Sequence, residues 1–168
     1  MKKKLVVGIV GLLILTMLVV IPLQIASADT VVATCKGKLI IAGPPKIGIV
    51  TYPDGNYHVR GQVIVYQTVF PDCDIPLDGP NTITANLNWD SDDFEEASGR
   101  SWGTFDKVVS YYEDTGFAGT FTADKYPNGY AGKMRGLGYG ELEGYRVMGE
   151  MEFTGNPYYG NIEVTVSE

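Results

Sequence analysis

The chain has 168 residues, with 13 basic and 20 acidic side chains, one histidine and two cysteines. The acidic excess excludes nucleic acid as a favourable partner, and one histidine cannot build a His-rich zinc site. About 140 residues follow the N-terminal apolar segment, enough for one domain with a proper core.

Residues 1–28 are predicted to be an export signal. Lysines at positions 2–4 precede the apolar stretch 5–21, and small residues at 26–28 form an A-x-A cleavage site. The apolar stretch is long for a signal and reaches the lower limit for a spanning helix, so a retained membrane anchor is the alternative. Either way, we expect domain 29–168 outside the cytoplasm, secreted or anchored through 5–21. It carries 10 basic and 20 acidic residues, a balance that favours solubility.

Cys35 and Cys73 are the only cysteines, and both lie in the exported part. An even number in an oxidising compartment predicts one disulfide. A metal or redox pair would need a CxxC spacing or neighbouring histidines, and neither is present. The bond would tie the first strand of the domain to the end of a long hairpin.

The first half of the domain predicts several strands. Segments 31–35, 38–41 and 47–52 are short candidates, and a turn at 53–56 leads into a long strand at 57–70. Unbroken alternation would place His58, Arg60, Gln62 and Tyr66 together on a mixed face, as expected where a strand lines a pocket or an interface. Gly61 would mark a bend.

A proline- and aspartate-rich loop is predicted at 71–81, followed by a strand at 82–89. The apolar and polar residues of 82–89 alternate cleanly, which places Ile83, Ala85, Leu87 and Trp89 inward. Residues 90–100 form an acidic loop. Segment 102–112 fits helical or strand spacing, and the likeness of 102–105 to 118–121 favours a strand.

Residues 116–155 contain ten glycines and seven aromatic residues, with no long run of helix formers. Consecutive antiparallel strands fit this pattern, and 162–166 predicts a closing strand. A glycine inside an apolar strand face indicates a bulge, a bend or close packing, which barrels need in order to coil and close. We therefore predict an all-β fold, a single antiparallel closed β-barrel of about eight strands, with a β-sandwich as the alternative.

Three motifs carry a family resemblance: W-G-T-F at 102–105, G-x-x-G-T-F at 116–121, and G-x-G-x-G-E-L-E-G-Y-x-x-x-G at 136–149. They resemble the meander of small prokaryotic exported proteins with an allene-oxide-cyclase-like or dirigent-like barrel. The likeness covers 82–153, about half of the exported part. It implies an eight-stranded barrel whose cavity guides a reactive intermediate, but it supplies no catalytic motif to carry over.

Two groups of residues are candidate sites. A small apolar ligand would contact a set of mixed aromatic and polar residues: His58, Arg60, Tyr66, Trp89 and Trp102. A weak Ca²⁺ site would use the acidic cluster Asp90, Asp92, Asp93 and Glu95, although its spacing matches no EF-hand and a solvated acidic loop is the alternative. The glycine run 136–140 predicts a strand or bulge, since no helix follows to form a phosphate site. No other cofactor is predicted.

The leading functional hypothesis is a non-enzymatic exported barrel that binds a small apolar ligand in its cavity or a partner on its surface. The second is a cyclase or isomerase, which would need His58, Arg60 or Glu150 to point inward beside a pocket. The third is a cell-surface structural or adhesion module with a retained N-terminal helix and an exposed aromatic patch.

Overall fold

The computed structural model describes residues 29–109 and 114–168. The predicted signal at 1–28 and the end of segment 102–112 lie outside the described residues. The described residues form nine strands: β1 Val31–Ile41, β2 Ile49–Thr51, β3 Tyr57–Val69, β4 Gly79–Trp89, β5 Gly99–Val108, β6 Gly116–Tyr126, β7 Gly129–Tyr139, β8 Arg146–Thr154 and β9 Tyr159–Ser167. Two short 3-10 turns, η1 Pro53–Gly55 and η2 Gly140–Leu142, complete the elements.

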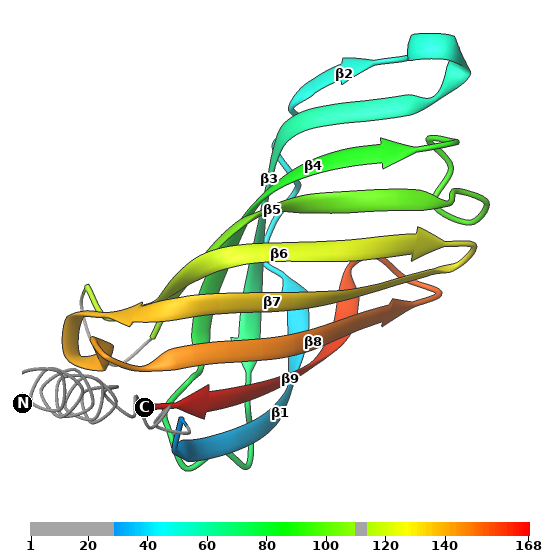
Figure 1. The fold of residues 1–168 in the computed structure, drawn as a ribbon. Helices are drawn as coiled ribbons and strands as arrows, with labels where there is room; N and C mark the ends of the chain where they lie inside the picture. Colours follow the sequence, from blue (N-terminus) through cyan, green and yellow to red (C-terminus); the bar gives the residue numbers. More distant parts are fainter. Residues whose placement is uncertain (1–28, 110–113) are drawn as a thin grey trace, which may run out of the picture.

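The strands form one closed antiparallel barrel, which confirms the predicted fold class over the sandwich (Figure 1). β3 to β9 follow one another as a meander, and β1 pairs with β9 on one side and β3 on the other. Eight strands therefore make the barrel, and β2 is an additional strand that pairs with β3. No helix in the described part of the chain has the length and apolar character needed to cross a bilayer.

β3 changes neighbours along its length, and Gly61 lies where it does so. Its second half pairs with the end of β1, and its first half pairs with β2. Between Val59 and Gln62 the register against β4 shifts by one residue, and Gly61 has φ of 70°. This is a β-bulge whose positive φ favours glycine. The predicted bend at Gly61 is confirmed.

The bulge corrects the predicted alternation of β3. Before it, Tyr57 and Val59 face the interior; after it, the inward residues are even-numbered, including Gln62 and Tyr66. The extra residue in a bulge shifts every later side chain to the other face. His58 and Tyr66, predicted on one face, therefore lie on opposite faces.

Glycines in β6 and β7 let a large ring fill the interior. Phe105 lies opposite Gly119, which lies opposite Gly136 on the next strand. A Cβ at Gly136 would approach Cζ of the buried Phe105 ring to 2.7 Å. Neighbouring small and large residues thus fit together across the coiled sheet, as the glycine-rich pattern predicted.

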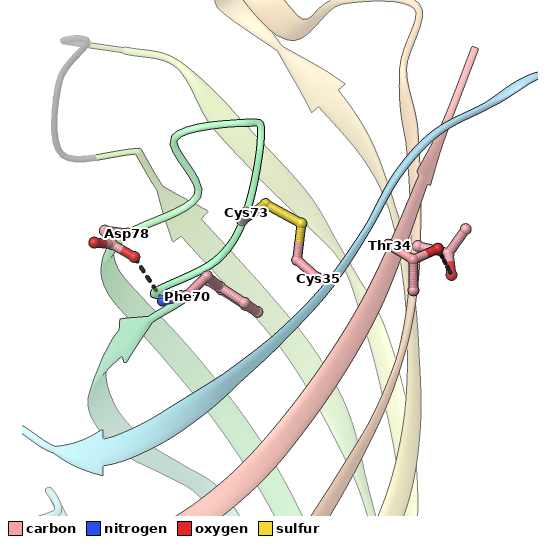
Figure 2. Close-up of a disulfide and its surroundings, with 6 residues drawn as sticks. Thr34, Cys35, Phe70, Cys73 and Asp78 are labelled. Carbon is pink, nitrogen blue, oxygen red and sulfur yellow. Dashed lines mark hydrogen bonds between the residues drawn. A yellow bond between two sulfur atoms is a disulfide. The ribbon is translucent and has the colours of Figure 1, made fainter.

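One end of the barrel, here called the disulfide end, is closed by the loop between β3 and β4. The Cys35–Cys73 disulfide is confirmed and joins β1 to this loop (Figure 2). Phe70 and Leu77 of the loop are buried and belong to the core. The loop ends at β4, which begins at residue 79, three positions before the predicted strand start.

Candidate functional site

The opposite end of the barrel, here called the cavity end, contains an internal cavity of about 310 Å³. This end carries the turns at 53–56, 90–98, 127–128 and 155–158, on the right in Figure 1. Mostly aromatic and aliphatic side chains line the cavity, among them Tyr57, Ile64, Tyr66, Ala85, Trp89, Phe94, Phe121, Tyr130, Met151 and Phe153. Such a mainly apolar, concave space with few polar groups is typical of sites for small organic molecules.

Tyr66 of β3 and Tyr130 of β7 both line the cavity, and both pack against the Phe153 ring. The centroid of the Phe153 ring lies 5.7 Å from that of Tyr66 and 5.8 Å from that of Tyr130. Burial raises the pKa of both phenols, that of Tyr130 to about 12. Both hydroxyls therefore remain protonated, neutral hydrogen-bond donors at physiological pH.

Trp89, at the end of β4, forms part of the mouth of the cavity. Its Nε1 donates a 3.0 Å hydrogen bond to Oγ of Ser101 on β5. The Trp89 ring packs against Tyr57 with 6.1 Å between centroids. The bond and the stacking fix the indole, so the mouth has one rigid aromatic wall.

A second mouth contact joins two hairpins. The Tyr52 hydroxyl, beside η1, donates to Oδ2 of Asp92 in the loop after β4 at 3.2 Å. Partial shielding of the hydroxyl from water and the Asp92 carboxylate that it contacts raise the pKa of Tyr52, although most of the side chain is exposed. The tip of the β2–β3 hairpin is thereby held against the acidic loop 90–98.

Lys125 fixes the other side of the acidic loop. Its buried ammonium donates to the carbonyl oxygens of Phe94, Ala97 and Tyr126 at 2.6, 3.1 and 2.6 Å, and lies 4.1 Å from the Phe94 ring centroid. Burial lowers the pKa of Lys125, and the charges of Asp90 and Asp93 oppose that shift. Phe94 lines the cavity, so Lys125 sets the position of one wall.

Three of the four predicted calcium ligands already accept hydrogen bonds, two of them from the backbone of the acidic loop itself. Asp90 accepts a 2.7 Å bond from the backbone N–H of Ser98, and Asp93 accepts one of 2.9 Å from that of Glu95. Asp92 accepts from Tyr52. Among the described residues, no three His, Cys, Asp or Glu side chains gather in a way that could hold a metal ion.

The five predicted ligand residues divide between the two faces of the barrel. Tyr66 and Trp89 line the cavity. Outside, the Arg60 guanidinium lies 5.0 Å from the centroid of the Trp102 ring, which is 37% exposed. His58, between the inward Tyr57 and Val59, also faces outward.

Sequence reasoning missed Tyr130 as a cavity residue, and it placed Gln62 on the mixed face of 57–70 without selecting it as a ligand residue. Gln62 faces inward only because of the bulge at Gly61. Tyr130 lies directly opposite Phe153 on β8, and the alternation of 146–153 puts Phe153 on the same apolar face as Val147 and Met151. Pairing these two segments would have identified it.

The sequence was compared with protein-family models and with curated proteins. No family model matches this chain, and no match to a curated protein was found. The case for function therefore depends on the cavity and its lining.

Proposed function

We propose that the protein is a non-enzymatic, extracytoplasmic barrel that binds a small apolar molecule in the cavity. One observation carries this proposal: an internal space of about 310 Å³ opens among aromatic and aliphatic side chains, while the rest of the core is filled. Burial of apolar ligand surface there would stabilise the complex by about 25 cal/mol per Å².

The disulfide supports the proposed compartment. This disulfide joins a strand of the small domain to one of its loops. Such bonds persist in oxidising surroundings, outside the cytoplasm. The predicted export signal at 1–28 has the same implication. An exported binder meets its ligand outside the cell or in the envelope, whether it is released or anchored through 5–21.

Membership of the allene-oxide-cyclase-like or dirigent-like barrel class is part of the proposal. It is supported by the eight-stranded antiparallel meander, the inward aromatic residues and the motifs between 102 and 149. In that class the cavity is the functional centre, which agrees with the site proposed here.

A cyclase or isomerase is less favoured because the acid and base groups that it requires lie outside. His58 and Arg60 face outward. Glu150 is exposed and pairs with Lys133 at 3.2 Å. Among the described residues that line the cavity, the only charged side chain is Asp92, at the mouth.

An adhesion module would need a gathered aromatic surface. Among the described residues, the exposed aromatic side chains stand on separate elements: Tyr52 precedes η1, Trp102 is on β5, Tyr126 ends β6, Tyr158 precedes β9 and Tyr159 begins it. All of them except Trp102 lie beside the turns of the cavity end. The cavity is therefore the better-supported site.

Binding of the fluorescent apolar probe N-phenyl-1-naphthylamine tests the proposal. We expect saturable probe fluorescence, excited by energy transfer from Trp89, in a protein carrying Trp102→Phe. Ala85 lines the cavity, so Ala85→Phe should fill it and abolish binding. The matched control is Thr84→Phe, at the adjacent outward and exposed position of β4. Equal binding by both variants, with circular dichroism unchanged, would place the probe elsewhere and refute the proposal.

A further inference from the structure

We infer that the ligand of the cavity is a neutral apolar molecule with a carbonyl oxygen, such as an aromatic or alicyclic ketone, and that Tyr66 and Tyr130 donate hydrogen bonds to that oxygen. This inference rests on the proposed function, since it specifies the chemical class of ligand for the same cavity. It excludes free fatty acids and other carboxylates as the preferred class.

The Tyr66 hydroxyl is the first donor. It makes no hydrogen bond to another described residue, although the side chain is only 6% exposed. In the described part of the chain, Asn81 Oδ1 is the only fully buried side-chain nitrogen or oxygen without a partner. The Tyr66 oxygen is therefore in contact with open space, and the space that its residue lines is the cavity.

The Tyr130 hydroxyl is the second donor. Tyr130 lines the same cavity as Tyr66, and both rings pack against Phe153, with 5.7 Å between the centroids of Tyr66 and Phe153 and 5.8 Å between those of Tyr130 and Phe153. The nearby Ser101 hydroxyl partly offsets the effect of burial on the pKa of Tyr130. The Ser101 Oγ already accepts a hydrogen bond from Trp89 Nε1, and Tyr130 lines the cavity, so the phenolic hydrogen of Tyr130 can turn toward a ligand.

The charges around the cavity favour a neutral acceptor. No lysine or arginine is among the described residues that line it. The ammonium of Lys125 near the mouth is already bonded to three backbone carbonyls. A carboxylate would lose its hydration without gaining a counter-ion and would meet the Asp92 carboxylate at the entrance. A carbonyl oxygen needs only the two donors.

Three naphthalene probes of similar size test this inference: 2-acetylnaphthalene has a neutral acceptor, 2-ethylnaphthalene has none, and 2-naphthoate is anionic. Quenching of Trp89 in the Trp102→Phe protein gives the Kd of each probe. In a Tyr66→Phe, Tyr130→Phe variant, we expect the Kd for the ketone to rise about 10- to 100-fold, because two hydrogen bonds are lost. The Kd for 2-ethylnaphthalene should change less than about twofold, and 2-naphthoate should bind least tightly.

Tyr126→Phe is the matched control, since Tyr126 is an exposed tyrosine on the same sheet; it should leave all three values unchanged. Equal losses for ketone and hydrocarbon in the double variant, or no loss for either, would overturn the inference while leaving cavity binding intact. A 2-naphthoate affinity equal to that of the ketone would overturn it as well. If none of the probes quenched Trp89, the proposed function itself would fail.

Discussion

The backbone N–H of Phe70 donates a 2.7 Å hydrogen bond to Oδ1 of Asp78, eight residues further along the chain (Figure 2). This bond draws together the two ends of the loop that carries Cys73, and the disulfide then joins that loop to Cys35 on β1. The side chains of Phe70 and Leu77 seal the disulfide end of the barrel. Covalent and hydrogen-bonded closure at this end leaves the cavity end as the site of ligand entry.

Replacing both cysteines should destabilise the domain without changing its fold. The bond joins residues 38 positions apart, for which loop entropy predicts about 4 kcal/mol. We expect Cys35→Ser, Cys73→Ser to lower the denaturant midpoint accordingly, measured by urea unfolding. A reducing agent should have the same effect on the native protein and none on the variant. A native midpoint that is insensitive to reduction would contradict this.

Asp78 should contribute separately to the same closure. Asp78→Ala removes the acceptor of the Phe70 N–H and is expected to cost about 1–3 kcal/mol in the free energy of unfolding, as for other hydrogen bonds to charged groups. Asp72→Ala, at an exposed position of the same loop, is the control and should change stability by less than about 0.5 kcal/mol. Similar unfolding curves for both variants would show that the bond adds nothing to the disulfide.

Gly61 should tolerate substitution poorly although nothing crowds it. No atom lies within 4 Å of a Cβ built there, but φ is 70°, so Gly61→Ala should cost about 1–2 kcal/mol through backbone strain alone. Gly43→Ala, equally uncrowded and without a positive φ, is the control and should be neutral or slightly stabilising. Equal thermal midpoints for the two variants would contradict the assignment of strain to Gly61.

The sequence predicted the architecture because that depends on patterns which recur over whole segments. Alternation at 82–89 correctly placed Ile83 and Trp89 inward, and the glycine–aromatic pattern correctly indicated a closed barrel. The cysteine count correctly indicated the disulfide. The strand and barrel predictions average over many residues, so an error at one position does not change them. The disulfide prediction depends on the redox chemistry of the compartment and not on the placement of any strand.

Individual site residues were harder to predict because one bulge moves every later side chain of its strand to the opposite face of the sheet. A glycine within a strand indicates a bulge without showing that a residue is inserted, so His58 and Arg60 were wrongly predicted to share a face with Gln62 and Tyr66. Trp102 was proposed as a ligand residue because it is aromatic. Phe105, three residues later in the same strand, is buried, so the alternation of β5 places Trp102 on the outer face. Residue type alone cannot distinguish a cavity wall from an outer surface.

Lys107 should make stability rise with pH over a defined window. Burial lowers its pKa to about 8, against an ordinary value of 10.5, and the charge of Asp78 limits the shift. Between these values the unfolded chain binds more protons than the native state, so stability rises with pH. It should increase by about 2 kcal/mol from pH 7.5 to 9.5 relative to Lys107→Met, measured by urea unfolding. Parallel pH profiles for the two proteins would rule out this role for Lys107.

Lys125 should hold the acidic loop at the mouth of the cavity. Lys125→Met leaves the carbonyl oxygens of Phe94, Ala97 and Tyr126 without their donor, and we expect a loss of about 2–4 kcal/mol with faster amide hydrogen exchange over 93–98. Lys133→Met is the control: its ion pair with Glu150 is exposed on both sides and is worth less than about 1 kcal/mol. Because Phe94 lines the cavity, Lys125→Met should also weaken binding of N-phenyl-1-naphthylamine. Faster exchange with unchanged probe affinity would show that the loop is not part of the site.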